Sequence, residues 1–135
     1  MRTKGAGLYS PDRRGVHLPH FEEFAVHALR FLAPTRLGAL VPGMPAAWAA
    51  EPMAGAIRSS GDEPPPVWPY ARGRVRGQAI EPLHPAAPEA VEDWPRLGEL
   101  LALLDSLRLG DARVRKVAGD LLAERLRSLP SVADL

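Results

Sequence analysis

Proline interrupts this chain so often that long unbroken helices are possible only in its C-terminal third. The 135 residues include 15 prolines and 12 glycines, and no proline lies between residues 96 and 129. Proline lacks a backbone N–H and fixes φ, so it ends or kinks a helix and weakens a central strand. We therefore predict a mostly α-helical protein in which compact helical pieces are joined by long irregular connections.

The composition fits a folded domain with nearly balanced charge. Hydrophobic residues make up 46% of the chain, which is ordinary for a globular protein and excludes wholesale disorder. The formal net charge is +1, whereas a dedicated nucleic-acid-binding protein needs a clear basic surplus to displace counterions. The charge therefore favours a protein partner over DNA or RNA.

The sequence contains no cysteine and no visible targeting signal. The absence of cysteine excludes disulfides, thiolate metal ligands and cysteine nucleophiles, and fits a cytoplasmic protein. The basic first 20 residues lack an apolar stretch, so no secretory signal is expected. The longest apolar region, 31–57, contains Arg36, Glu51 and four prolines, so no membrane-spanning helix is expected there.

The N-terminal half is predicted to hold an irregular arm at 1–19 and a helical segment at 20–58. Apolar residues recur at helical spacing over 20–33, and Pro34 is expected to end this first helix. The apolar positions of the first helix are Phe21, Phe24, Ala25, Ala28, Phe31 and Leu32. Shorter helical pieces, expected to be marginal alone, span 35–40 and 46–57.

Residues 59–92 are predicted to form a proline-rich extended connector. Residues 74–80 have the length of a short strand, but Gly73 and Gly77 weaken that interpretation, so we expect a loop throughout. A structureless segment of this length is uncommon inside a compact domain and is typical of a connector or a binding arm.

Residues 93–130 are predicted to form a helical hairpin, with its helices over 94–129. Asp93 and Asp111 are the expected N-caps, and Gly110 is expected to end the first helix in a left-handed conformation. The apolar stripes of the two helices contain Leu97, Leu100, Leu101, Leu104 and Leu107, then Val114, Val117, Ala118, Leu121, Leu122 and Leu126. Two helices alone cannot cover both stripes, so a third wall must come from the first helix or from a partner protein.

The stretch PPPVWPYARGRVRG, residues 64–77, is the best candidate for a binding element. Its proline run favours polyproline II, which docks into aromatic-lined grooves at low entropic cost. The same residues could instead lie across the helices of their own chain, and both alternatives stay open. The predicted partner-binding residues, from this stretch and from the hairpin stripes, are Trp68, Tyr70, Arg72, Arg74, Arg76, Leu100, Leu104 and Leu121.

Nucleic-acid binding is the alternative function. Alternating arginines beside two aromatic residues form a combination that grips single strands. Further arginines, on the second hairpin helix, are Arg113, Arg115, Arg125 and Arg127. However, Glu63 and Glu81 flank the 64–77 stretch, and acidic residues share the hairpin helix, so a protein partner is favoured.

A metal site is conceivable on the first helix. His20, Glu23 and His27 are three and four residues apart, which places their side chains on one helical stripe where they could share a cation such as Zn²⁺. A solvated polar face is the simpler interpretation of the same spacing. We therefore expect no cofactor.

The sequence carries no signature of an enzyme. There is no glycine-rich phosphate loop and no serine in a nucleophile elbow, and only 4 histidines are available for acid–base chemistry at neutral pH. These features favour a non-catalytic accessory subunit or adaptor, which binds a partner protein or a further copy of itself in a larger soluble assembly. Nucleic-acid binding or regulation through the arginines remains the alternative.

Overall fold

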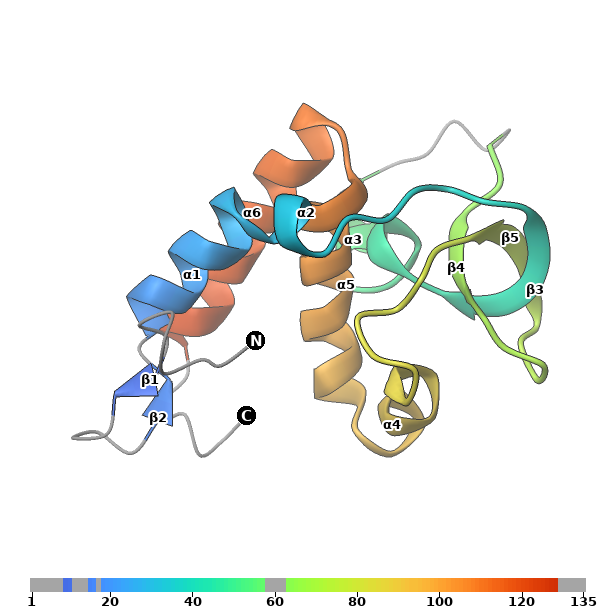
Figure 1. The fold of residues 1–135 in the computed structure, drawn as a ribbon, viewed down its shortest axis with the longest axis horizontal. Coiled ribbons are helices and arrows are strands. Elements are labelled where there is room, and N and C mark those ends of the chain that lie inside the picture. Colours follow the sequence, from blue (N-terminus) through green and yellow to red (C-terminus); the bar gives the residue numbers. More distant parts are fainter. Residues whose placement is uncertain (1–8, 11–14, 17, 58–62, 129–135) are drawn as a thin grey trace.

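A layer of helices packs beside a small barrel of three strands (Figure 1). This computed structural model describes residues 9–10, 15–16, 18–57 and 63–128. The helical majority confirms the predicted class, but the sequence pattern did not indicate the barrel. Most of the predicted N-terminal arm lies outside the described residues. Its described part includes an antiparallel pair of two-residue strands, β1 (Tyr9–Ser10) and β2 (Gly15–Val16).

The predicted first helix is divided into α1 (Leu18–His27) and α2 (Leu29–Leu32). Because the helix is interrupted at Ala28, its apolar stripe does not continue into α2. Phe31 and Leu32, expected on the apolar face, are instead 68% and 64% exposed. Pro34 follows closely after the end of α2, as predicted.

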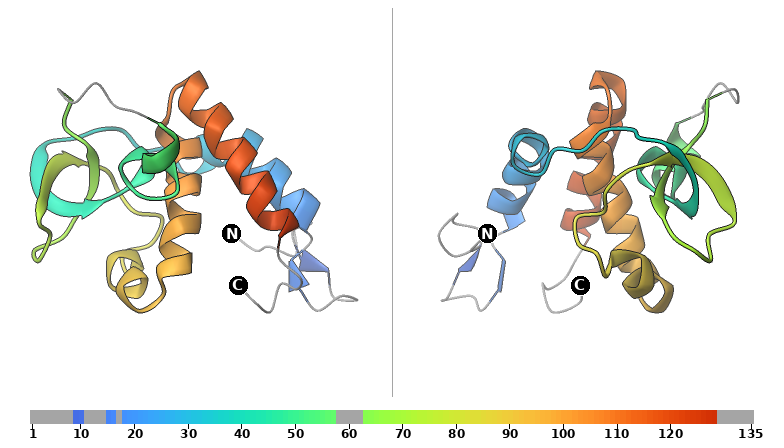
Figure 2. Two further views of the ribbon diagram at one scale, coloured as in Figure 1. Left: turned by 180° about the vertical axis from the view of Figure 1, so that it is seen from behind. Right: turned by 45° about the vertical axis from the view of Figure 1, so that its right-hand side comes forward.

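The predicted hairpin is present as α5 (Pro95–Leu109) and α6 (Ala112–Arg127). Helix α5 is the centre of the molecule, because it contacts α6, α2 and the barrel side of the fold (Figure 2). Its residues Ala102–Arg108 are all buried. A helix enclosed on every side loses the one-sided pattern of a surface helix, so the predicted leucine stripe describes only part of its packing.

The ends of the hairpin confirm one predicted detail and correct two. The Asp111 carboxylate accepts a hydrogen bond of 2.9 Å from the Val114 N–H, so it caps α6 as predicted. Asp93, however, is the last residue of α4 (Ala87–Asp93), and Trp94 precedes α5 without a side-chain cap. Gly110 has φ −67°, which is not left-handed. A Cβ at this glycine would lie 2.4 Å from the Val114 side chain, so close approach explains the glycine.

The described residues of the predicted connector at 59–92 contain two strands and most of a helix, which corrects the prediction of a loop throughout. The elements in this region and just before it are β3 (Leu40–Pro45), β4 (Pro66–Pro69), β5 (Val75–Ala79) and α4. Strand β3 pairs antiparallel with both β4 and β5, and a short parallel pairing of β4 with β5 closes the barrel. The helix expected at 35–40 is absent: residues 35–39 have no regular secondary structure, and Leu40 begins β3.

Glycines make the tight barrel possible. A Cβ on Gly43 would lie 2.3 Å from the Trp68 carbonyl oxygen, and a Cβ on Gly77 would lie 2.1 Å from the Pro65 carbonyl oxygen. Both distances are shorter than a nonbonded contact allows, so only glycine lets these backbones approach. Gly77, which weakened the strand prediction, is therefore a residue that β5 requires.

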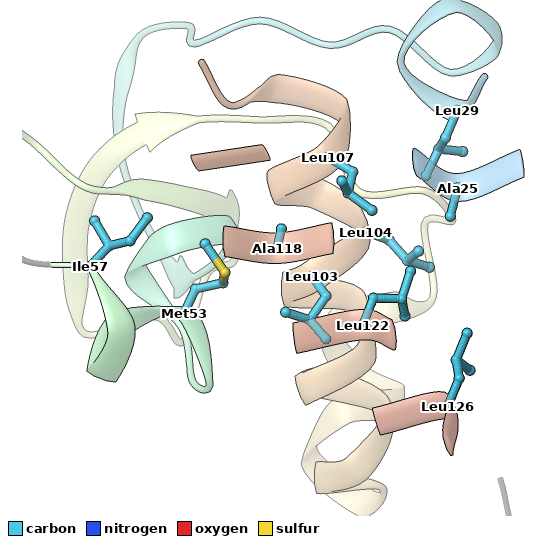
Figure 3. Packing of buried hydrophobic residues seen from close by; sticks show 10 residues of the cluster. All are labelled: Ala25, Leu29, Met53, Ile57, Leu103, Leu104, Leu107, Ala118, Leu122 and Leu126. Atoms are coloured by element: carbon cyan, nitrogen blue, oxygen red, sulfur yellow. The ribbon is translucent and has the colours of Figure 1, made fainter. Parts of the chain in front are cut away.

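Two hydrophobic clusters share α5. The helical cluster, shown in Figure 3, contains Ala25, Leu29, Met53, Ile57, Leu103, Leu104, Leu107, Ala118, Leu122 and Leu126. The barrel cluster contains Ala46, Ala47, Trp68, Ile80 and Ala87. The 3₁₀ turn η2 (Ala47–Ala49) and α3 (Met53–Ala56) occupy the predicted helical region at 46–57 and contribute to both clusters. The third wall of the hairpin is thus supplied by the chain itself.

Within the described part of the chain, none of the helices combines the length and the apolar character needed to cross a bilayer.

Candidate functional site

Trp68, predicted to bind a partner, is buried against its own chain with only 3% exposure. Its indole Nε1 donates a hydrogen bond of 2.9 Å to Asp105 Oδ2 on α5. Arg108 Nη1 lies 2.7 Å from Asp105 Oδ1 and also donates to the carbonyl oxygen of Glu81 at 3.0 Å. The Arg108 Nε donates to the carbonyl oxygen of Ala33 at 2.8 Å. This network joins β4, α5 and the segments after α2 and β5, so the 64–77 stretch folds onto its own helices.

The buried carboxylate of Asp105 is a structural group. Burial raises the pKa of Asp105, while the hydrogen bonds from Arg108 and Trp68 oppose that rise. The side chains of Asp105 and Arg108 are 0% and 3% exposed, so neither can reach a dissolved substrate. The network therefore holds the barrel to the helices and offers no accessible chemistry.

Tyr70 and Arg72, two other predicted contact residues, lie on the surface but interact with Glu92 of α4. The Tyr70 hydroxyl donates to Glu92 Oε1 at 2.9 Å, and Arg72 bonds to the same hydroxyl and lies 3.6 Å from Glu92 Oε2. Desolvation and the hydrogen bond to Glu92 raise the pKa of Tyr70. The Arg72 guanidinium also lies 5.1 Å from the centroid of the Tyr70 ring. These contacts attach the β4–β5 turn to α4.

The remaining predicted residues are divided between surface and core. Arg74 and Arg76 are exposed at the β4–β5 turn and on β5. Leu104 is buried in the helical cluster and is only 8% exposed. Leu100 and Leu121 are half-buried, and both line a surface groove.

His20, Glu23 and His27 are exposed on α1. In the part of the chain that the structure describes, no group of three or more His, Asp or Glu side chains is placed to hold a metal ion. The structure therefore does not assemble these three residues into the metal site considered from the sequence.

Leu100 and Leu121 line a groove with a volume of about 1350 Å³. It lies between the α4–α5 corner and the last turns of α6. Its lining residues are Ala90, Asp93, Trp94, Pro95, Arg96, Leu97, Glu99, Leu100, Leu121, Glu124, Arg125, Leu126 and Ser128. Leucines from both helices of the hairpin are thus combined with charged residues of both signs.

An ion pair crosses the groove between its two helices. Arg125 Nη1 on α6 donates to Glu99 Oε2 on α5 at 2.8 Å, and the two side chains are 33% and 39% exposed. The pair joins the two walls. Asp93, Arg96 and Glu124 are exposed residues of the same groove.

Trp94 is the functional candidate that the sequence reasoning missed. It lies at the corner between α4 and α5, and 68% of its surface is exposed. The sequence places Trp94 at the start of the hairpin but does not indicate which way its ring faces, because that depends on the corner formed with α4. Its position between Asp93 and Pro95, where α4 cannot continue directly into α5, was the available signal.

Two other surface features are smaller or more isolated. A hollow of about 240 Å³ beside Trp68 and Met44 is smaller than the roughly 300–1,000 Å³ of typical small-molecule sites. Phe31 and Leu32 are exposed on α2, and the Arg30 guanidinium lies 4.6 Å from the centroid of the Phe31 ring. Neither feature combines an exposed aromatic side chain with a groove.

No protein-family model matches this chain, and no curated protein or solved structure matches it significantly. Function therefore has to be inferred from the surface of the molecule.

Proposed function

We propose that this protein is a non-catalytic protein-binding subunit, and that it binds its partner through the groove between the α4–α5 corner and α6. The observation that carries the proposal is Trp94, which is 68% exposed at the edge of a groove lined by leucines. Tryptophan is enriched among the few residues that dominate binding energy at protein interfaces. An exposed tryptophan beside an apolar groove is the arrangement that such an interface requires.

The dimensions and charges of the groove support a polypeptide partner. Its volume of about 1350 Å³ exceeds the range of roughly 300–1,000 Å³ for small-molecule sites. Its leucines are half-buried or buried, whereas Asp93, Arg96 and Glu124 are exposed charged residues of both signs. Apolar centres with polar rims are the usual composition of protein interfaces.

Nucleic-acid binding through Arg72, Arg74 and Arg76 has weaker support. Arg72 is paired with Glu92, and this carboxylate would repel a phosphate at the same turn. The net charge of +1 supplies no basic surplus elsewhere. Binding to single strands at low salt, weakened by replacing Arg74 and Arg76 with alanine, is the result that would favour this alternative.

Affinity capture from the native cell, followed by binding measurements with the purified partner, tests the proposal. Replacing Trp94 with alanine should weaken partner binding by at least about 2 kcal/mol, or roughly 30-fold in Kd. Phe31→Ala is the matched control, because Phe31 is also 68% exposed but lies on α2, toward the other end of α5. A partner that binds both variants as tightly as the wild type contradicts the proposed site.

A further inference from the structure

The groove has an exposed tryptophan at its edge and an apolar surface that could bind a tryptophan. Trp94 lies at its edge, and Leu97, Leu100 and Leu121 provide the apolar surface that a tryptophan ring can cover. All three leucines are only half-buried in the single chain. A partner that presents a tryptophan from a similar corner would cover these leucines, and at the same time would offer a groove for Trp94. Another copy of the chain has both features.

We infer that the groove binds a second copy of this chain, forming a two-fold dimer in which Trp94 of each copy enters the groove of the other. The inference rests on the protein-binding function proposed above and names its partner. An isologous interface of this kind uses the same patch on both subunits. Each tryptophan would bury on the order of 150–250 Å², and the symmetry counts that burial twice.

The charges on the rim are self-complementary. Asp93 at the end of α4 and Arg96 in the first turn of α5 lie at one wall of the groove, whereas Glu124 and Arg125 of α6 lie at the other. With a two-fold axis along the groove, the α5 wall of one copy faces the α6 wall of the other. Arg96 of one copy then faces Glu124 of the other in both halves of the interface, while Arg125 keeps its ion pair with Glu99 of its own chain. A partner with a single sign of charge would instead meet repulsion from one member of each wall.

The experiment is sedimentation velocity of the full chain across the micromolar concentration range, together with two variants. The wild type should show a concentration-dependent monomer–dimer equilibrium. Trp94→Ala removes an anchor from each copy, so it should raise the dimer dissociation constant by more than about 30-fold, with unchanged circular dichroism. The matched variant Phe31→Ala should dimerise like the wild type. A wild type that stays monomeric over the whole range overturns the inference.

Charge exchange tests the two-fold arrangement itself. Arg96→Glu and Glu124→Arg should each weaken the dimer, because each places like charges opposite one another across the interface. The double variant should restore dimerisation toward the wild-type level. Failure of this rescue overturns the two-fold pairing. A monomeric wild type that captures a different protein through Trp94 overturns the dimer and leaves the proposed function intact, whereas binding that is independent of Trp94 in both assays overturns both.

Discussion

Trp68 and Asp105 lie 37 residues apart in the chain and are joined by a buried hydrogen bond of 2.9 Å between the indole Nε1 and the carboxylate Oδ2. The bond links β4 of the barrel to the central helix α5. Arg108 completes the network from the next turn of the same helix. Because Asp105 and Arg108 are buried and depend on each other, the attachment of the barrel to the helices should be sensitive to the loss of any one member.

Trp68→Phe should lower the free energy of unfolding by about 1–3 kcal/mol, because it leaves a buried carboxylate oxygen without its donor. Urea denaturation followed by circular dichroism measures the change. Tyr70→Phe is the matched control, since it removes an aromatic donor to the Glu92 carboxylate at the surface, where water can replace the hydroxyl. If Trp68→Phe and Tyr70→Phe lower the free energy of unfolding equally, the buried Trp68–Asp105 hydrogen bond has no special role in stability.

Arg108→Met should be more damaging, at about 3–5 kcal/mol, because it leaves Asp105 charged and unpaired in the interior. The carbonyl oxygens of Ala33 and Glu81 also lose their donor. Lys116→Met, which breaks an exposed pair of 3.3 Å with Asp120, should cost no more than about 0.5 kcal/mol. The denaturant midpoints of Arg108→Met and Lys116→Met, compared at constant m-value, measure the two losses of stability. A small loss for Arg108→Met would show that buried Asp105 does not depend on Arg108.

The free energy of unfolding should depend on pH through the raised pKa of Asp105. Burial raises its pKa above the ordinary value of 3.8, so the folded state binds this proton more tightly than the unfolded chain. The resulting stabilisation is complete below that value and is lost as the pH rises through the folded pKa. The wild type should therefore gain stability relative to Asp105→Asn as the pH falls from neutral toward about 4. Urea titrations at several pH values measure the difference in unfolding free energy between the two proteins, in which the contributions of all other titrating groups cancel. A wild type that loses stability relative to Asp105→Asn as the pH falls would contradict a raised pKa of Asp105.

The helical hairpin could be predicted because its signals are local. Leucines at helical spacing, the Asp111 cap and the absence of internal proline define α5 and α6 within a few residues. The burial of Ala102–Arg108 on every side of α5 could not be predicted in the same way. The residues that enclose it include Trp68 and Ala33, and both are brought there by distant parts of the chain.

The barrel could not be predicted because its strands lack the usual local pattern. β4 begins and ends with proline, and β5 contains Gly77, so both contradict ordinary strand propensity. What stabilises them is the pairing of β3 with both strands across long sequence separations. The same limit applies to the groove. Leu100 and Leu121 could be proposed from their stripes, but Trp94 gains its role from a corner between two helices.

Gly77→Ala tests whether close backbone approach, rather than flexibility, explains the glycines of the barrel. Its Cβ would lie 2.1 Å from the Pro65 carbonyl oxygen and 2.7 Å from the Val67 side chain, so the barrel must open to accept it. We expect a loss of at least about 2 kcal/mol, in the range of overpacked cores. Gly119→Ala on α6 is the control, because the nearest atom of Val26 is 3.8 Å away. In a helix, replacing glycine with alanine should stabilise the protein by roughly 0.5–1 kcal/mol. The midpoints of thermal and urea unfolding should therefore fall for Gly77→Ala and rise for Gly119→Ala. If both variants shift the midpoints in the same direction, the backbones are not in close contact at Gly77.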